Sequence, residues 1–492
     1  MQGVDIPNVR PKRVLVIGGG PSGLVTLRNL VERGNFHDVQ LVERRADVGG
    51  VWYLDDDHNA PNAKPTSAAP RWPSPAYPGL IGNVLPEFLS FSAFPPFPEP
   101  ISTISGQPFP SLSETHTYLR AFASPLSSQG KIRLNTEVCT VEELREQTGW
   151  QVRMRRWNLD GSAEDFSETW DAVVVAIACY DHPVFPNTPG IAQLRKLGLA
   201  RHAQTWRGPD GCQGKRILVI GNANSGNDIA AQLAPVASAV FQSIRRPNFP
   251  GFPSLPDPRI ARVAPVQQYI INQLDEVDVV DAHLTDGTVI SNLDGVVFGT
   301  GYCPFPDFVR VFNRADTQQT LVPIVTADTI PSRVPDLHRY MLYAHNPTLA
   351  FVGTAVASYT PFTIADICST WLALAWTGAI AYPTTPDGLL AFEAERLAAV
   401  AAARKEMEAA PSGTSDQRQT EASALVAYGV LGPFEEAYAS SLREEVVKVR
   451  PELGPVLPVW NQEQTAVREA MFGRKRAALE LARECERKQL GL

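Results

Sequence analysis

Neither cysteine nor histidine is arranged for metal or redox chemistry in this sequence. The six cysteines are scattered over 492 residues without a CxxC pair, and the eight histidines form no HExxH pattern. Metal sites and redox disulfides depend on such spacings, so we expect no metal and no catalytic cysteine pair. Scattered thiols are typical of a reducing compartment, where they stay free.

A positively charged surface and a long apolar run are also missing. The formal net charge is −8 and Lys and Arg form no run, which argues against a nucleic-acid partner. Residues 1–13 lack the apolar core of a signal peptide, and the longest apolar run, near 371–381, is too short to cross a bilayer. We therefore expect a cytoplasmic protein with no membrane partner, and we interpret this run as a core helix.

What the sequence does have is a glycine turn at the end of a buried strand. Residues 12–23 read KRVLVIGGGPSG, which predicts a strand over 14–17, a turn over 18–23 and a helix over 24–30. The free N–H groups of such a helix N-terminus attract phosphates. The six residues of the turn are Gly18, Gly19, Gly20, Pro21, Ser22 and Gly23.

Each outer and middle glycine of this turn has a predicted role in binding a dinucleotide. Gly18 makes the tight turn, Gly20 lets the backbone approach a pyrophosphate, and Gly23 lets the helix pack closely on the strand. A second strand, 39–42, ends in Glu43, whose carboxylate is placed to bind a ribose hydroxyl. The strand, the helix and the acid together favour this interpretation over a chance glycine turn.

The same pattern recurs about 200 residues later. Residues 214–221 repeat a lysine–arginine pair, a buried strand and a glycine, and a helix is predicted over 227–233. Two such units in one chain predict two dinucleotides. The residues of this second turn that we assign to cofactor binding are Gly221, Ala223, Asn224, Ser225 and Gly226.

The residues after each unit's second strand differ in charge. Arg245 and Arg246 follow the second strand of the second unit, and Arg246 stands as far from Gly221 as Glu43 stands from Gly18. An arginine suits the 2′-phosphate of NADP, whereas an acid suits a ribose hydroxyl. We therefore expect FAD in the first unit and NADPH in the second, with two solvated surface arginines as the alternative.

Several motifs, taken in order, resemble those of the flavin-containing monooxygenases over nearly the whole chain. They are GGGPSG at 18–23, ERRADVGGVW at 43–52, YPGLIGNVLP at 77–86, FSAFPPFP at 91–98, GNANSG at 221–226, SIRRPNF at 243–249, FGTGY at 298–302 and PTLAFVGTA at 347–355. Their order and spacing are far more specific than any single glycine motif.

This resemblance implies further site residues. Val51 and Trp52 would lie along the flavin, and the backbone of Val138 would lie near the adenine. Asn83 matches an asparagine that reaches toward the reactive face of the flavin, which makes it the candidate catalytic residue. A carboxamide can both donate and accept hydrogen bonds there. From the residues alone, Trp52 also fits a core tryptophan and Asn83 a turn asparagine.

The resemblance further implies an α/β fold with two Rossmann-like domains. An FAD domain in two segments, 1–212 and 304–388, would enclose an NADPH domain at 213–303, and a helical C-terminal region, 389–492, would follow. We expect nothing catalytic in that C-terminal region. The oligomeric state stays open, with a homodimer among the states that the sequence allows.

The implied enzyme is an NADPH-dependent flavin monooxygenase that forms a C4a-(hydro)peroxyflavin. It would transfer one oxygen atom from O2 to a nitrogen or sulfur atom of a small organic substrate. A biosynthetic pathway is one setting for such a reaction. The alternatives are Baeyer–Villiger oxygen insertion next to a ketone and, from another class, a non-catalytic nucleotide-binding sensor. A disulfide reductase would need the cysteine pair that the sequence lacks.

Three positions depart from the family pattern and bear on the substrate. Lys196 stands where an aromatic residue belongs, Ala178 replaces a glycine after a central strand, and Ala223 replaces the middle glycine of the second turn. Trp206 is typical of Baeyer–Villiger relatives, but Arg207 follows it where those relatives have proline.

Overall fold

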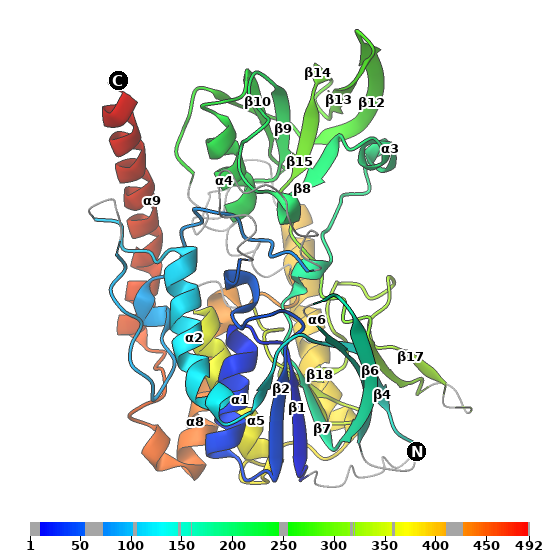
Figure 1. The fold of residues 1–492 in the computed structure, drawn as a ribbon, viewed down its shortest axis with the longest axis vertical. Helices are drawn as coiled ribbons and strands as arrows, with labels where there is room; N and C mark the ends of the chain where they lie inside the picture. Colours follow the sequence, from blue (N-terminus) through cyan, green and yellow to red (C-terminus); the bar gives the residue numbers. More distant parts are fainter. Residues whose placement is uncertain are drawn as a thin grey trace.

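The computed structural model describes residues 10–54, 72–101, 106–145, 149–158, 160–245, 254–314, 318, 320–356, 360–409 and 427–490. The chain forms two lobes, which lie one above the other in Figure 1. Each lobe contains a largely or wholly parallel sheet with helices against it. The expected fold class, α/β with two Rossmann-like units, is confirmed.

The sheet of the lower lobe joins strands from distant parts of the chain. Its order is β18-β19-β20-β7-β1-β2-β3; β20, β7, β1, β2 and β3 are parallel and the two edge strands β18 and β19 are antiparallel. The bounds are β1 Arg13–Ile17, β2 Asp38–Val42, β3 Ile132–Arg133, β7 Ala172–Val175, β18 Leu337–His338, β19 Leu342–Tyr343 and β20 Leu349–Phe351. The central strands read as continuous apolar runs because both faces of the sheet are covered.

A mixed five-stranded sheet completes the lower lobe, in the order β17-β16-β4-β5-β6. Its strands are β4 Thr136–Glu143, β5 Trp150–Trp157, β6 Ala163–Trp170, β16 Val309–Phe312 and β17 Leu321–Pro323. Val141, Trp150 and Trp170 of this sheet are fully buried and pack in one cluster with Leu15 of β1. The two sheets of this lobe therefore share one core.

The upper lobe holds a five-stranded parallel sheet in the order β11-β10-β9-β15-β8 and a three-stranded antiparallel sheet, β12-β13-β14. The bounds are β8 Ala200–His202, β9 Arg216–Ile220, β10 Ala239–Ser243, β11 Ile260–Val263, β12 Val266–Leu274, β13 Val277–Leu284, β14 Val289–Leu293 and β15 Gly295–Phe298. Strand β8 pairs with β15, and helix α3, Ile191–Lys196, packs against the same lobe. We therefore propose that the second domain begins near Gly190 instead of at residue 213.

Two connections join the lobes, and they run side by side. Val184 N donates to Gly301 O at 2.9 Å, and Cys303 N donates to His182 O at 3.0 Å. The first of these connections contains Pro183, Pro186 and Pro189, and prolines are typical of segments without regular structure.

Helices cover the lower sheet and extend the chain to its end. Their bounds are α1 Pro21–Arg33, α2 Leu112–Ser128, α4 Asn224–Leu233 in the upper lobe, α5 Pro361–Trp376, α6 Pro386–Ala409, α8 Glu435–Val449 and α9 Gln462–Leu490. Short 3-10 turns are η1 Gly50–Trp52, η3 Pro86–Leu89, η4 Cys179–Asp181, η5 Ala203–Thr205, η6 Gly432–Phe434 and η7 Pro451–Leu453. Within the described ranges, no helix is long and apolar enough to cross a membrane.

The apolar run near residue 371 forms α5, which is a core helix as expected. Its contact with α1 contains a buried charge network around Asp366, which is 0% exposed. Arg28 and Arg33 of α1 lie 3.2 and 3.3 Å from Asp366 Oδ1, and Ser92 N donates to Asp366 Oδ2 at 2.7 Å. Burial lowers the pKa of Arg33, while the Asp366 carboxylate opposes that shift. This network fixes α1, α5 and the segment around Ser92 together.

Two rings of residues 91–98 pack into this core. Phe91 and Phe97 are 2% and 7% exposed. Phe91 stacks on Phe362 of α5 with the ring centroids 5.2 Å apart, and Phe97 lies 4.7 Å from Tyr118 of α2. This segment is therefore tied to α2 and α5 by aromatic contacts.

Candidate functional site

The first glycine turn joins β1 to α1 through backbone contacts. Gly18 has a φ of +108°, and its N–H donates to Val42 O at 2.9 Å. A Cβ on Gly23 would lie only 1.8 Å from Gly18 O, so the helix packs on the turn as closely as glycine allows. The roles expected for these two glycines are thus visible in the protein itself.

Gly20 differs because the protein leaves room beside it. It is the N-cap of α1, with φ −76° and ψ −179°, and no side chain caps this helix end. A Cβ built on Gly20 would have its nearest contact with Gly50 Cα, at an ordinary 3.6 Å. The backbone of the turn is therefore open at the position where a pyrophosphate is expected.

A second pair of glycines lies directly on this turn. Gly49 N donates to Gly19 O at 2.8 Å, and a Cβ on Gly50 would lie 2.9 Å from Gly20 Cα. Glycine at 50 is required by this contact and by its φ of +56°. The Gly49–Gly50 pair therefore braces the first turn from one side.

Glu43 follows β2 and lies against the same turn. Its side chain is buried, and its two oxygens accept from Gly19 N at 2.6 Å and from Arg45 N at 2.9 Å. Burial raises the pKa of Glu43, while these two N–H groups lower it. A carboxylate has about four acceptor positions, so hydroxyl donors can still bind it. The carboxylate and the open backbone at Gly20 fit the ribose and pyrophosphate of a dinucleotide.

Val51, Trp52 and Val138 lie near these groups. Val51 and Trp52 form η1 directly after Gly50. Thr136 N donates to Glu43 O at 2.8 Å, so β4 begins beside Glu43 and Val138 lies two residues further along it. The structure therefore brings the residues expected to bind FAD to one edge of the lower sheet.

Asn83 lies in a turn that backbone contacts hold on both sides. Gly82 N donates to Pro110 O at 2.8 Å, and Leu85 N lies 3.3 Å from Met471 Sδ of α9. Asn83 itself is half-buried, and its carboxamide has no hydrogen-bond partner among the described residues. A carboxamide in a fixed turn with unused donors and acceptors is available to a ligand.

The turn of Asn83 lies next to η1. Trp52 and Leu80 pack against the same small cluster, formed by Leu54, Ala76 and Leu112. Trp52 thus packs partly as a core tryptophan, the alternative that the residues alone allow. The same packing places Leu80, three residues before Asn83, close to η1, which includes Gly50 of the Gly49–Gly50 pair.

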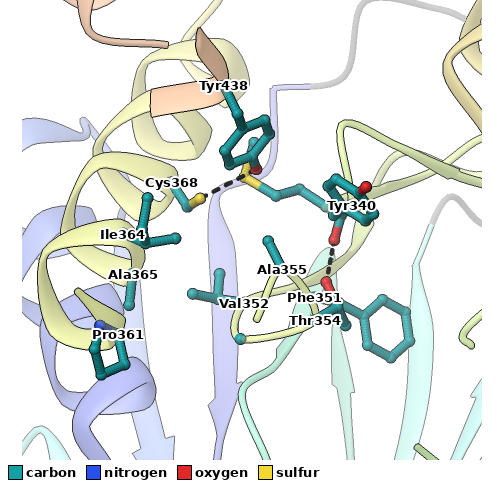
Figure 2. Close-up of a pocket in the computed structure, with 12 residues that line it drawn as sticks. Tyr340, Phe351, Val352, Thr354, Ala355, Pro361, Ile364, Ala365, Cys368 and Tyr438 are labelled. Atoms are coloured by element: carbon teal, nitrogen blue, oxygen red, sulfur yellow. Dashed lines mark hydrogen bonds between the residues drawn. The ribbon is translucent and has the colours of Figure 1, made fainter. Parts of the chain in front are cut away.

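The loop after β20, part of which is drawn in Figure 2, contacts the first turn of α1. A Cβ on Gly353 would lie 3.2 Å from Ser22 Oγ, and Thr354 Oγ1 donates to Tyr340 O. A cavity of about 10 Å³ lies behind this loop, the size of a single water molecule. This loop was part of the family resemblance, but its contact with Ser22 is not visible in the sequence.

Cysteine chemistry has no place beside this loop. The Cys368 thiol lies 3.3 Å from Tyr438 Oη, as drawn in Figure 2. Burial raises the pKa of Cys368 to about 12, so its thiolate is not populated near neutral pH. The cysteines whose side chains are described form no disulfide, and no metal-ligand cluster occurs among the described residues.

The second glycine turn repeats the geometry of the first. Gly221 has a φ of +108°, its N–H donates to Ser243 O at 3.1 Å, and a Cβ on Gly226 would lie 2.4 Å from Gly221 O. Ala223 is the N-cap of α4 with φ −85° and ψ −172°, close to the values of Gly20. Alanine therefore occupies the middle position without changing the backbone. Asn224 and Ser225, in the first turn of α4, are exposed.

The offset that matched Arg246 to Glu43 is not a structural equivalence. Val42 pairs with Ile17 directly before Gly18, and Ser243 pairs with Ile220 directly before Gly221. Ile244 is therefore the equivalent of Glu43, because α4 has 10 residues whereas α1 has 13. Arg245 is exposed directly after it, and Arg246 lies outside the described residues.

Trp206, which is typical of Baeyer–Villiger relatives, lies in the upper lobe together with His202 of β8. His202 and Trp206 are both buried, and Trp206 Nε1 donates to Gln232 Oε1 at 3.0 Å. Burial lowers the pKa of His202 to about 4, so this imidazole stays neutral. Lys196 and Ala178 are exposed.

Comparisons with known proteins agree with this geometry. A family model described as flavin-binding monooxygenase-like matches residues 11–249. The flavin-containing monooxygenase FMO GS-OX3 of Arabidopsis thaliana is 30% identical over 389 residues, which cover 77% of this chain and 76% of the relative. The thiol-specific monooxygenase of Saccharomyces cerevisiae is 26% identical, with 72% and 75% covered. Among solved structures, the S-allyl-L-cysteine S-oxygenase of Allium sativum has the same fold, with a TM-score of 0.61 at 23% identity over 94% of this chain and 98% of that one.

Proposed function

Because the chain belongs to the flavin-containing monooxygenases and is an oxidoreductase of that family, we propose its cofactors and its reaction. FAD binds at the first glycine turn and NADPH at the second. One atom of O2 is transferred to a sulfur or nitrogen atom of a small organic substrate, and the other leaves as water. NADPH supplies the two electrons that balance this step.

The observation that carries the proposal is the open backbone at Gly20, next to the buried carboxylate of Glu43. A Cβ at Gly20 would meet no protein atom closer than 3.6 Å, while Gly23, in the same turn, has no room at all. Packing therefore explains glycine at 23 but not at 20. A ligand that approaches the backbone explains it.

The side chains hold and orient groups, while the flavin, when bound, supplies the activation of oxygen. The N-terminus of α1 binds the pyrophosphate and Glu43 binds a ribose hydroxyl. Arg245 and Arg246 bind the 2′-phosphate of NADPH with charge-assisted hydrogen bonds. Asn83, the candidate catalytic residue, would offer its N–H groups to the oxygen that is transferred and its carbonyl oxygen to the nicotinamide amide.

Sulfur is the atom that we favour, because a relative that covers most of the chain is named a thiol-specific monooxygenase. Trp206, which suggested ketone insertion, is buried and bonded to Gln232, so its identity reflects packing in the second unit. No other feature of the described residues favours insertion next to a ketone.

The test is oxygen uptake by the purified, FAD-loaded protein with NADPH and a panel of thiols, thioethers, amines and ketones. We expect NADPH oxidation and oxygen uptake in equal amounts, with a sulfoxide or N-oxide as product. Uptake with lactone or ester formation from ketones would overturn the heteroatom assignment. Tight nucleotide binding without any oxygen uptake would support the sensor alternative instead.

A further inference from the structure

The C-terminal helix α9 contacts the turn that carries Asn83. Lys475 Nζ donates to Gly82 O at 2.7 Å, and one helical turn earlier Met471 Sδ lies 3.3 Å from Leu85 N. Residues 471 and 475 share one face of the helix, because residues four apart are neighbours on its surface. Two contacts from one helix thus hold the turn on both sides of Asn83.

Lys475 is a largely buried cation at this contact. Its Nζ lies 4.9 Å from the centroid of the Phe109 ring, a cation–π distance. Asp228 of α4 attracts it electrostatically from the upper lobe. Burial lowers the pKa of Lys475 to about 8, and the charge of Asp228 opposes that shift. Burial also raises the pKa of Asp228, and Lys475 lowers it.

Asp228 belongs to the helix that begins at the second glycine turn. Its Oδ2 accepts from Gln232 Nε2 at 3.2 Å, and Gln232 Oε1 accepts from Trp206 Nε1. The charge that acts on Lys475 therefore belongs to a polar chain within the upper lobe, while the hydrogen bond of Lys475 goes to the lower lobe. It lies where the two lobes and α9 meet.

The same helix is attached to the upper lobe two turns further on. Arg483 Nη1 donates to Pro256 O at 2.6 Å, and Arg483 Nη2 lies 3.7 Å from Asp257 Oδ2. Figure 1 shows α9 running from beside the lower lobe to beside the upper one. The helix thus spans both lobes and contacts each through a basic side chain.

We propose that Lys475 is a positioning residue for the oxygenation reaction, which holds the Gly82–Leu85 turn, and so Asn83, at a fixed place relative to α4. The proposal rests on the proposed function for the role of Asn83. Without the ammonium group, the turn loses the donor to Gly82 O, and Asp228 of α4 loses the attraction of this cation, whatever the reaction is.

The primary measurement is hydrogen exchange of the amides of 82–85 in the purified protein, compared among three variants. Lys475→Met removes the charge and the donor but keeps an unbranched side chain, and Lys475→Arg keeps the charge. Lys488→Met is the matched control, because Lys488 is an exposed lysine on the same helix. We expect Lys475→Met to speed exchange of these amides about tenfold or more, the factor for losing one charged hydrogen bond. Lys488→Met should leave it unchanged.

A pH series separates positioning from bulk packing. Among the described groups near Lys475, Asp228 from α4 is the charge that acts on it. Gly82 and Phe109 carry no charge. The flanking Arg474 and Arg476 on α9 are exposed. The ammonium is present below about pH 8 and lost as the pH rises through that value. After correction for intrinsic exchange rates, protection of the turn should fall there in the wild type but not in Lys475→Arg, since arginine stays charged.

Product yield per NADPH consumed gives the functional readout. Lys475→Met should release more hydrogen peroxide per NADPH at unchanged flavin content, and Lys475→Arg should restore the yield. Unchanged exchange and unchanged yield in Lys475→Met would overturn the proposal while leaving the monooxygenase assignment intact. Faster exchange with unchanged yield would also overturn it, by reducing Lys475 to a structural contact. Failure of the wild type to consume NADPH would refute the proposed function instead, and only the exchange data would then bear on Lys475.

Discussion

Exchanging two glycines of one turn for alanine should separate flavin binding from folding. At Gly20 an added Cβ has 3.6 Å to its nearest protein atom, and the φ of −76° suits any residue. Ala223 already occupies the equivalent place in the second unit with nearly the same dihedral angles. We therefore expect Gly20→Ala to change the stability of the flavin-free protein by no more than about 1 kcal/mol.

The same methyl group should weaken flavin binding, because it stands where the backbone meets the pyrophosphate. Loss of one hydrogen bond to a charged group costs about 1.5–3 kcal/mol. This corresponds to a dissociation constant for FAD that is about 10- to 150-fold higher. Gly20→Val, with a larger side chain, should abolish flavin retention.

Gly23→Ala should have the opposite profile. Its Cβ would lie 1.8 Å from Gly18 O and 2.9 Å from Gly18 C, both backbone atoms that cannot turn aside. Helix α1 would have to move away from β1, and overpacking of this kind costs about 1–3 kcal/mol or more. The flavin-free protein itself should therefore be less stable.

The assay compares urea unfolding of the flavin-stripped proteins and then titrates each with FAD. Stripping is needed because bound flavin raises the apparent stability by mass action. Unchanged FAD affinity in Gly20→Ala and Gly20→Val would refute the placement of the pyrophosphate. A Gly23→Ala protein as stable as the wild type would show that α1 can move without cost, contrary to the contact distances.

The sequence predicted the elements whose signal is local. Strands expected over 14–17 and 39–42 form as Arg13–Ile17 and Asp38–Val42, because buried parallel strands are short continuous apolar runs. The helix expected over 24–30 begins earlier, at Pro21, since proline suits the first helical position. The glycine turns followed from spacing alone, because their geometry is contained within six residues.

The sequence could not show relations between distant segments. Counting residues matches Arg246 to Glu43, but strand pairing places Ile244 there, since helix α4 is shorter than α1. The contact of Lys475 with Gly82 joins positions 393 residues apart. A lone lysine on a charged helix carries no sign of that contact, which is why the C-terminal region was interpreted as having no part in the site. Strand pairing and docking of α9 depend on the whole packed chain.

Three further changes test the site and its support. Replacing both Arg245 and Arg246 by alanine should weaken NADPH binding by about 1.5–3 kcal/mol per lost charged hydrogen bond and leave NADH binding nearly unchanged, as isothermal titration would show; a retained preference would place the 2′-phosphate elsewhere. Asp366→Ala should lower the free energy of unfolding, measured by urea denaturation, by about 3–5 kcal/mol, because the buried charges of Arg28 and Arg33 lose their counter-ion. A loss below about 1 kcal/mol would show that water reaches this network. Asn83→Ala should keep its flavin and still oxidise NADPH. The rate at which oxygenated product forms should fall on the order of 10²–10³-fold, the usual effect of removing one preorganised donor. Hydrogen peroxide would be released in place of product, and quantifying both against NADPH consumed makes the loss visible. The turn is held by backbone contacts that do not involve this carboxamide, so folding should be unaffected; a normal product yield would therefore leave Asn83 as a turn residue with no part in the chemistry.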